Sequence, residues 1–427
     1  MGDNSSMKHA LFVAFHYPPE ANSSGVLRTL KFSRYLSDFG WRVTVLTINI
    51  GAYEVIDETL VEQIPKNVRV VRTNYIDTKR HLSIAGIYPA ILAVPDRWVG
   101  WLPWAVSAGK RILSEEKIDL IYSTSPLGTS HLISTKLSKF SGLPLVIDFR
   151  DPWYEDTREV GMPWVNYYFA PKLELKVIKQ ASKIVTSTKQ LRDLLVDRYP
   201  LKAEENFTCI LNGYDEEDFK DLPTVNNKST DRLVFIHAGG INPEFRDPIP
   251  LFRVICELAN TGDLELENIC IRFLGPGDFA HSKIMKKAVK DLKLENVVEF
   301  LPRIPYQEAL TELAKASVLL LLQASDDTTS LVPAKLYEYL RAQKPVLAIV
   351  YPGVTQDIIN DSDGGWFVDP RDSGAMLKLF RKIYNHWLSE TLDYKVASLD
   401  SLSKYNRKKL TGQLAKVLNS AVRESSA

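Results

Sequence analysis

Short apolar runs alternate with longer amphipathic segments along the chain from Lys8 onward. The runs are rich in Val, Ile, Leu and Phe, which is typical of buried strands in a parallel sheet joined by crossover helices. In the first half, the predicted strands are residues 10–15, 42–47, 68–72, 119–124, 143–149, 183–188 and 207–211. The predicted helices between them are residues 26–38, 103–116, 128–140 and 189–198. The pattern therefore predicts an α/β fold.

A polar, turn-rich stretch, DLPTVNNKSTD at 221–231, interrupts the alternation and is typical of an interdomain linker. The pattern then restarts, with predicted strands at 233–240, 270–275, 297–301, 317–322 and 345–350 and helices at 306–315 and 334–342. We expect two Rossmann-like, doubly wound domains facing each other across a cleft, where ligands of such folds bind. The expected division is an N-terminal domain at 1–220, the linker at 221–231, a C-terminal domain at 232–390 and a helical segment at 391–427 that returns to the N-terminal domain.

The composition is that of an ordinary globular protein. Of 427 residues, 45% are hydrophobic and 25% are charged, and the formal net charge of +1 gives no indication of a nucleic-acid partner. The three cysteines are odd in number and are not spaced like metal ligands, so we expect neither a disulfide framework nor a zinc site. The polar N-terminus lacks an apolar leader, and the longest apolar runs are far shorter than the ~20 residues that span a bilayer. We expect a cytoplasmic protein.

The stretch FHYPPEANSSGVLRTLKFSRYL at 15–36 leaves a strand through a small-residue loop and opens a helix near Ser24 or Gly25. The free backbone N–H groups of a helix N-terminus suit a phosphate. Gly25 would let a ligand approach the backbone closely, and Arg28 would add positive charge one turn later. A capped helix on a surface loop is the alternative interpretation.

Two stretches of the second half carry comparable features. In HAGGINPEFRDP at 237–248, Arg246 follows a strand end and can face a diphosphate; otherwise it is a solvated loop arginine. In SDDTTSLVPAKLYEYLRAQKPVLAIV at 325–350, a helix starts near Pro333 and Ala334. Glu338 lies one turn into that helix, where its carboxylate can accept from both hydroxyls of a ribose. Without such a ligand, Glu338 would be an ordinary helix glutamate.

Polar residues at other strand ends are candidates for the acceptor side. His16 directly follows the first strand, which favours a substrate contact. The pair Arg150 and Asp151 follows the strand LPLVIDF and either binds an acceptor or pins a loop by an ion pair. Ser125 is a further strand-end candidate, whereas His131, inside a predicted helix, is better interpreted as a packed or surface histidine.

Three tryptophans recur at spacings of three residues: Trp98, Trp101 and Trp104. On a helix they would share one face, which would bind glycans by stacking or lie at a membrane interface. Core packing is the commoner explanation for buried tryptophans. Lys110 and Arg111, just beyond, would suit an anionic lipid surface, so a peripheral contact with the inner face of the membrane stays open.

The order of these motifs resembles the glycosyltransferases of family 4, which have the GT-B fold. The resemblance rests on PPEANSSG and GWRVTVLT at the front, LNGYDEEDF before the linker, and PAKLYEYLRAQKPVL late in the chain. DFRDPW at 148–153, with PDRWVGWLPW before it, looks like a branch associated with bacterial surface-polysaccharide assembly. The resemblance covers nearly the whole chain.

The resemblance implies roles for individual residues. Gly25 would contact the diphosphate, Arg246 would be the counterpart of a phosphate-binding lysine, and Glu338 would bind the ribose. Two positions depart from the family pattern: a usual arginine is Gly240, and a usual glutamate eight positions before Glu338 is Ser330. The full expectation is a donor site of Gly25, Arg28, Gly240, Arg246, Ser330, Leu331, Val332 and Glu338, an acceptor site of Ser125, Arg150, Asp151, Trp153 and Trp101, and catalytic roles for His16, Asp151 and Arg246.

These residues predict transfer of a sugar from a nucleotide-sugar donor, with UDP-sugars favoured, to a glycan or a lipid-linked glycan. The resemblance implies retention of the anomeric configuration and no metal or other cofactor, the nucleotide sugar being a co-substrate. A silent homologue that binds nucleotide sugar or scaffolds a glycan-assembly complex is the alternative, because Gly240 and Ser330 remove two family side chains. A nucleotide-sugar epimerase or hydrolase on the same fold is a second alternative.

Overall fold

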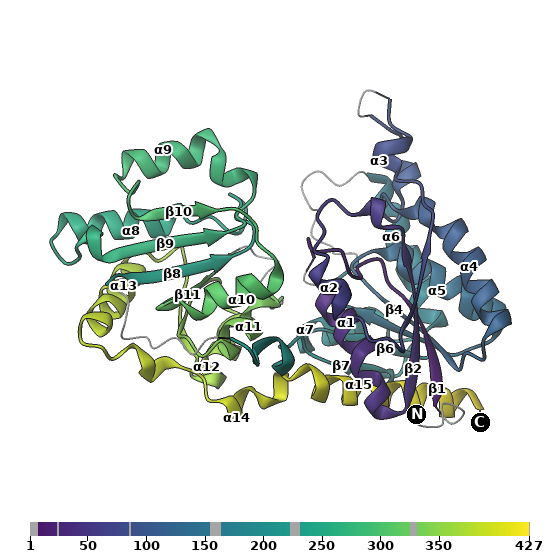
Figure 1. Cartoon of the computed structure of the whole chain (residues 1–427). Helices are drawn as coiled ribbons and strands as arrows, with labels where there is room; N and C mark the ends of the chain where they lie inside the picture. The colour runs from purple at the N-terminus through teal and green to yellow at the C-terminus, as the bar shows by residue number, and fades with distance from the viewer. Residues whose placement is uncertain are drawn as a thin grey trace. The chain divides into compact units, whose positions relative to one another are not determined.

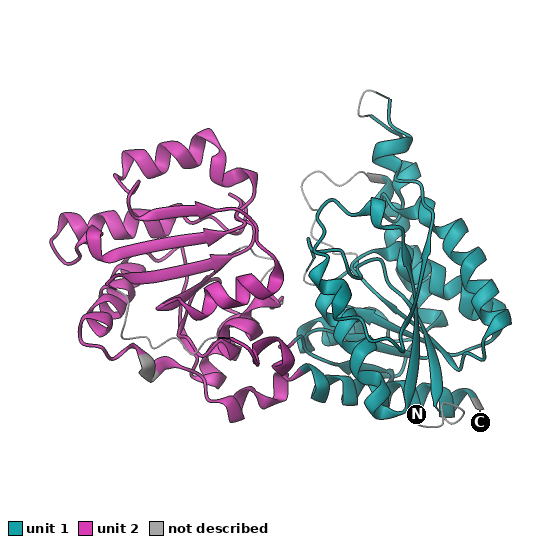
Figure 2. Cartoon of the chain, in the orientation of Figure 1, with its two compact units in different colours: residues 1–212, 407–427 teal, residues 213–406 magenta. Residues whose placement is uncertain are grey.

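The computed structural model describes residues 7–23, 25–84, 87–153, 164–222, 231–324 and 331–426. The chain forms two compact units (Figure 2): unit 1 comprises residues 1–212 and 407–427, and unit 2 comprises residues 213–406. Most of the expected linker, residues 223–230, lies outside the described residues.

Two segments belong to unit 2 that the sequence assigned elsewhere. Residues 213–220 were expected in the N-terminal domain, but the backbone N–H of Tyr214 donates to the carbonyl of Tyr405 at 3.1 Å. The carbonyl of Asp218 accepts from Gln307 at 2.7 Å. Residues 391–406 were expected to return to unit 1, yet the carbonyl of Ala397 accepts from Gln343 of unit 2 at 2.9 Å. The segment that returns to unit 1 is therefore shorter and begins at residue 407.

Unit 1 contains a parallel sheet that has seven strands in the described residues, in the order β3-β2-β1-β4-β5-β6-β7. The strands are β1 (Lys8–Val13), β2 (Trp41–Ile48), β3 (Arg69–Thr73), β4 (Leu120–Thr124), β5 (Leu145–Phe149), β6 (Lys183–Thr186) and β7 (Phe207–Cys209). The helices are α1 (Gly25–Tyr35), α2 (Thr59–Glu62), α3 (Thr78–His81), α4 (Leu102–Glu115), α5 (Gly128–Ser141), α6 (Trp164–Gln180), α7 (Lys189–Arg198) and α15 (Arg407–Ser426). The strand order reverses between β1 and β4, where ligands of doubly wound sheets bind.

Unit 2 contains a second parallel sheet, six-stranded in the described residues, in the order β10-β9-β8-β11-β12-β13. The strands are β8 (Leu233–Ala238), β9 (Ile269–Leu274), β10 (Val298–Leu301), β11 (Val318–Gln323), β12 (Val346–Val350) and β13 (Gly365–Val368). The helices are α8 (Ile249–Asn260), α9 (Lys283–Asp291), α10 (Tyr306–Ala314), α11 (Lys335–Arg341), α12 (Val354–Ser362), α13 (Ser373–Leu388) and α14 (Leu399–Leu402). The order reverses between β8 and β11, which places the ends of these strands at the switch point of unit 2.

Helix α15 completes unit 1 although it lies at the end of the chain. In Figure 1 it runs beside α1, near both termini. Leu410, Leu414 and Leu418 recur at every fourth position, so they share one helix face, and all three are buried in the same core cluster as Phe32 of α1. None of the described helices is both long and apolar enough to cross a membrane.

Candidate functional site

The loop after β8 presents Arg246 at the end of the unit 2 sheet. The Asn242 side chain accepts from the backbone N–H groups of Phe245 and Arg246 at 2.9 and 3.2 Å, which folds the loop back on itself. The guanidinium Nε of Arg246 donates to the Gln323 side chain, at the end of β11, at 3.3 Å. Arg246 thus lies at the switch point of unit 2, with its side chain bonded to the end of β11.

A second cation, Lys335, reaches the same place from α11. Its Nζ atom donates to the carbonyl of Ala238, the last residue of β8, at 2.5 Å. A Cβ atom on Gly239 would lie 2.9 Å from this Nζ atom, and Gly239 has a φ of +105°, a conformation that side chains disfavour. Glycine at 239 therefore leaves the room that Lys335 occupies.

Burial, reinforced by the neighbouring charge of Arg246, lowers the pKa of Lys335 to about 7, against a smaller opposing effect of Glu338. Within the described residues, the side chains of Arg246 and Lys335 donate to the neutral amide of Gln323 and to the carbonyl of Ala238. His237, beneath them in β8, has a pKa well below its ordinary value, chiefly because it is buried, so it adds no charge. Two basic side chains that converge at one strand end and donate to neutral groups are an arrangement that favours an anionic ligand.

Glu338 is held in place by Tyr306, the first residue of α10. The Tyr306 hydroxyl donates to Glu338 Oε1 at 2.9 Å and also lies 3.3 Å from Asp218 Oδ2. Asp218 belongs to the short 3₁₀ helix Glu216–Phe219, which is part of the LNGYDEEDF motif. Tyr339 anchors α11 to β8, because its hydroxyl accepts from the N–H of Ala238 at 2.8 Å. Tyr306 thus fixes the orientation of one carboxylate oxygen of Glu338, and Glu338 lies on the same helix as Lys335.

The structure describes three of the other expected donor residues, Gly240, Leu331 and Val332. Gly240 is exposed beside Gly239. Leu331 is partly exposed, and its carbonyl accepts from Thr355 at 3.3 Å, whereas Val332 is buried. Ser330 lies outside the described residues. A pocket beside Arg246 is lined by, among others, Phe245, Gln323, Tyr351 and Arg371.

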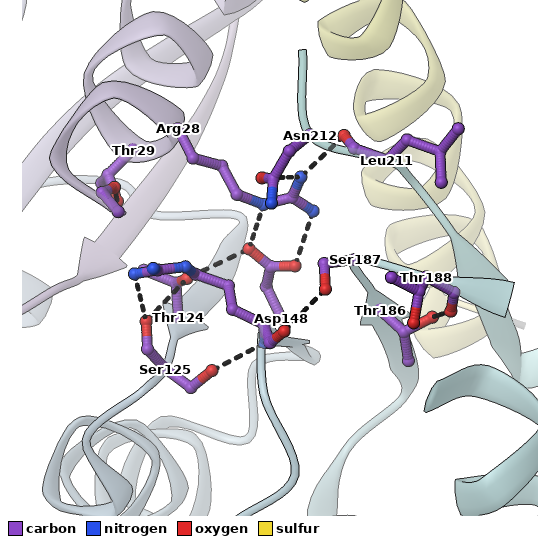
Figure 3. A network of polar contacts seen from close by, with 12 residues as sticks. Arg28, Thr29, Thr124, Ser125, Asp148, Thr186, Ser187, Thr188, Leu211 and Asn212 are labelled. Carbon is purple, nitrogen blue, oxygen red and sulfur yellow. Dashed lines mark hydrogen bonds and ion pairs between the residues drawn. The ribbon is translucent and has the colours of Figure 1, made fainter. Parts of the chain in front are cut away.

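In unit 1, Arg28 forms an internal ion pair instead of facing a ligand (Figure 3). Its Nε and Nη2 atoms donate to the two carboxylate oxygens of Asp148 at 2.9 and 2.8 Å, and Nη1 donates to the carbonyl of Leu211 at 2.9 Å. Arg28 is 2% exposed, so the expected donor contact by Arg28 is wrong for this structure. A helix arginine and a strand-end aspartate far apart in sequence give no local signal of such a pair.

Asp148 lies at the centre of this network. It also accepts from the hydroxyls of Tyr122 and Thr124, at 2.7 and 3.0 Å. Burial alone would raise the pKa of Asp148, but the charge and hydrogen bonds of Arg28 outweigh burial and hold the pKa below its ordinary value. Asp148 is therefore an ionised internal anchor between β5 and α1.

Arg150 and Gly25 meet where β5 ends and α1 begins. A Cβ atom on Gly25 would lie 1.6 Å from Nη1 of Arg150, so the guanidinium packs directly on the glycine. Ser125 positions Arg150, since its hydroxyl accepts from the Arg150 N–H at 2.7 Å and its carbonyl accepts from Nη1 at 3.2 Å. The N–H of Gly25 donates to the Ser23 hydroxyl at 3.1 Å, and is thus already engaged. The structure thus brings together three predicted site residues, Gly25, Ser125 and Arg150. In this arrangement Gly25 provides the space that the Arg150 guanidinium occupies.

The remaining predicted residues of unit 1 fall into two groups. His16 is partly exposed and lies 3.1 Å from Glu20 through Nδ1, and Asp151 is partly exposed beside Arg150. Trp153 packs against Gly128 at the start of α5, where a Cβ atom would lie 2.3 Å from its ring. These three side chains retain surface that a ligand can contact.

Trp101 and Trp98 are core residues. Trp101 is 0% exposed and donates through Nε1 to Thr73 at 2.7 Å, and Trp98 is 6% exposed. Helix α4 begins at Leu102, so the three tryptophans do not share a helix face; Trp104 alone is exposed. The expectation that Trp101 contacts the acceptor is wrong, because a fully buried ring offers no surface. Core packing, the alternative, is confirmed for Trp98 and Trp101.

His131 is also a packed residue. It is fully buried, and its Nδ1 atom lies 2.8 Å from the Ser123 hydroxyl. Burial lowers the pKa of His131 to about 4, so the ring is neutral near pH 7. Among the described residues no cluster of His, Cys, Asp or Glu has the arrangement of a metal site.

The sequence matches two family models that together extend over most of the chain. Residues 26–218 match Glycosyltransferase Family 4, and residues 218–408 match Glycosyl transferases group 1. A comparison with curated protein sequences found no match.

Solved structures with the same fold cover almost the whole chain. HepE from Anabaena, in complex with UDP and glucose, is 15% identical with a TM-score of 0.68 and covers 97% of this chain and 100% of that one. Sucrose-phosphate synthase from Thermosynechococcus elongatus is 14% identical with a TM-score of 0.69, over 97% and 98% of the two chains. The lipopolysaccharide outer core galactosyltransferase WaaB, in its apo form, is 13% identical with a TM-score of 0.60, over 97% and 99%. At these identities the likeness concerns the fold, which is GT-B with two Rossmann-like domains.

Proposed function

This chain belongs to the glycosyltransferases of family 4, and from that premise we propose that it transfers a sugar from a UDP-sugar to a glycan or lipid-linked glycan in bacterial polysaccharide synthesis. We propose that transfer retains the anomeric configuration and takes place in the cytoplasm. Unit 2 binds the donor, and unit 1 contributes the acceptor contacts. The nucleotide sugar is a co-substrate, and the reaction uses no further cofactor.

The convergence of Arg246 and Lys335 at the end of β8 carries this proposal. When the bond between the sugar and the diphosphate breaks, negative charge develops on the departing phosphate oxygen. Two preplaced cations stabilise that charge, and they need no reorganisation during the reaction. Within the described residues, Arg246 donates to the neutral side chain of Gln323 and Lys335 to the carbonyl of Ala238, and a bound diphosphate would favour the charged form of Lys335.

Lys335 supplies the positive charge that an arginine at position 240 would supply in the family pattern. An arginine after β8 would reach the diphosphate from the loop, whereas Lys335 reaches the end of β8 from α11, through the space above Gly239. Glu338, one helical turn later, accepts from the ribose hydroxyls. The Tyr306 hydroxyl, which donates to Oε1, keeps the Glu338 carboxylate in this orientation. This arrangement argues for a competent donor site in spite of the departure at Gly240.

On the acceptor side, His16, Arg150, Asp151 and Trp153 are the proposed contacts. Asp151 is partly exposed and directly follows Arg150 in the chain. An ionised carboxylate accepts from a sugar hydroxyl and orients it for attack. With retention, that hydroxyl attacks the face of the sugar that the diphosphate vacates.

Calorimetric titration with UDP, GDP, ADP and CMP tests the donor site. We expect the protein to bind UDP, and we expect Glu338→Ala to weaken this binding by about tenfold or more, as for loss of a hydrogen bond to a charged group. Glu257→Ala, an exposed glutamate of α8, is the matched control and should leave binding unchanged. Binding of none of the four nucleotides would refute the donor assignment.

A turnover assay separates the proposal from its alternatives. Purified protein is incubated with UDP-sugars, with and without a glycan acceptor panel, and products are identified by mass spectrometry. Asp151→Asn should lower kcat and leave UDP affinity unchanged, because it acts on the acceptor. UDP binding without any turnover would favour a silent homologue, and an altered or hydrolysed sugar without acceptor would favour an epimerase or hydrolase.

A further inference from the structure

One connection of unit 1 exposes an unusual number of large apolar side chains. It runs from α3 to the 3₁₀ helix Ala90–Ala93, and we name its described residues, 78–84 and 87–93, the arm. Figure 1 shows α3 at an extremity of unit 1. Ile84 and Ile87 are 84% and 78% exposed and pair with each other through two backbone hydrogen bonds, at 2.9 and 3.0 Å. The other exposed apolar side chains of the arm are Leu82, Ile91 and Leu92.

The exposed charges of the arm are all positive. Helix α3 carries Lys79 and Arg80, both exposed. Asp77, just before it, is buried and accepts from the N–H of Lys79 at 2.9 Å as the helix cap. Within the described residues of the arm no acidic side chain is present.

Helix α6 lies next to the arm, because it contacts the 3₁₀ helix Ala90–Ala93, and it carries exposed cations of its own. Tyr168, Lys172, Lys176 and Lys179 are exposed at spacings of four, four and three, so they lie along one helix face. The Lys172 ammonium lies 3.4 Å from the centre of the Tyr168 ring. The acidic residue of α6, Glu174, is fully buried and bonded to Arg198 and Tyr199.

This surface differs from the chain as a whole, whose formal net charge is only +1. We propose that the arm and the lysine face of α6 dock onto an anionic lipid surface, with the apolar side chains entering the headgroup region and the cations contacting lipid phosphates. Exposed apolar side chains, an aromatic ring and lysines in neighbouring elements are the combination that binds anionic bilayers. A second copy of this surface fits poorly, because two sets of cations would meet without exposed acidic partners. The proposal goes beyond the proposed function, since lipid binding needs neither donor nor acceptor.

Vesicle co-sedimentation of the full chain tests this inference. We expect binding to vesicles of phosphatidylcholine with about a third phosphatidylglycerol, weak binding to pure phosphatidylcholine, and loss of binding at high salt. The double variant Ile84→Asp with Ile87→Asp should abolish binding. Lys172→Glu with Lys176→Glu should reduce it by at least about fivefold for each lysine.

A control variant in unit 2 makes the test specific. Helix α9 also carries exposed lysines, but among its described residues Ile284 is the one large apolar side chain that is exposed, whereas the arm exposes five. The double variant Ile284→Asp with Lys286→Glu should therefore leave vesicle binding unchanged. Equal binding by the wild type and the arm variant, or no binding to anionic vesicles, would overturn the proposal. So would a dimer in size-exclusion chromatography that the arm variant abolishes while vesicle binding persists. UDP affinity measured in the same variants should be unchanged, which separates failure of this inference from failure of the donor assignment.

Discussion

The guanidinium of Arg150 lies against the Cα atom of Gly25, in the space that the side chain of any other residue at position 25 would need. The distance from a Cβ atom on Gly25 to Arg150 Nη1 would be 1.6 Å, and those to the next two guanidinium atoms would be 2.3 and 2.7 Å. The hydroxyl and carbonyl of Ser125 hold Arg150 from the other side. The start of α1 and the end of β5 are thus fitted to each other.

Gly25→Ala should therefore lower activity and stability together. The methyl group displaces Arg150, and overpacking of this kind costs about 1–3 kcal/mol. Thermal unfolding and acceptor kinetics measure the two effects. Gly374→Ala, in the first turn of α13, is the matched control: its Cβ atom meets only an ordinary contact at 3.5 Å, so it should be neutral or stabilising. Unchanged stability and kinetics in Gly25→Ala would contradict the geometry.

Asp148→Asn should destabilise unit 1 strongly. The substitution leaves the buried Arg28 charge unpaired, which costs about 3–5 kcal/mol. Urea unfolding followed by fluorescence gives the change. Asp291→Asn breaks the exposed pair with Lys287 and should cost less than about 1 kcal/mol. If both variants unfolded at the same urea concentration, the Arg28–Asp148 pair would not be the anchor described here.

Affinity for a UDP-sugar should fall as pH rises from 7 to 8.5. Lys335 has a pKa of about 7, lowered first by burial and then by Arg246, and the bound diphosphate favours its protonated form. Above pH 7, binding must therefore take up a proton, so affinity decreases by up to about tenfold per pH unit. The diphosphate of a UDP-sugar has no titrating group in this range.

Lys335→Arg is the control for that profile. Arginine keeps its charge throughout the range, so the variant should bind with little dependence on pH. Lys335→Met should bind weakly at every pH. A profile in Lys335→Arg as steep as that of the wild type would show that the pH dependence comes from a group other than Lys335.

Tyr306→Phe should weaken UDP binding by about three- to tenfold, because the hydroxyl that orients Glu338 is lost. UDP lacking the ribose hydroxyls is the matched ligand, since it cannot use the Glu338 carboxylate. The variant should bind this ligand as well as the wild type does. An equal loss for both ligands would mean that Tyr306 supports the fold of α10 and not the orientation of Glu338.

The alternation of apolar runs predicted the strands of both sheets, because buried parallel strands leave a strong local pattern. Strand β13 was missed, since it has only four residues, Gly365–Val368, and it starts with a glycine. Arg246 stood out because it follows a strand end, and Glu338 because it lies one turn into the helix of the late family motif. Lys335 did not, although it lies three residues before Glu338, because its importance comes from β8, a strand nearly a hundred residues away in the sequence.

The errors at Arg28 and Trp101 have the same origin. An arginine one turn into a helix and a tryptophan before a helix look alike whether they face a ligand or the core. Only the positions of Asp148 and Thr73, on other strands, decide between these cases. Roles that depend on a distant partner are therefore the part of the site that the sequence alone could not supply.

The return of α15 to unit 1 makes unit 2 an insertion within unit 1. The polypeptide passes from one unit to the other twice, after residue 212 and after residue 406. An exchange of unit 2 between relatives therefore needs two junctions, and a single crossover would leave unit 1 with a foreign α15 against its core. Recombination in nature or in the laboratory would have to preserve the match between α1 and the last helix of the chain.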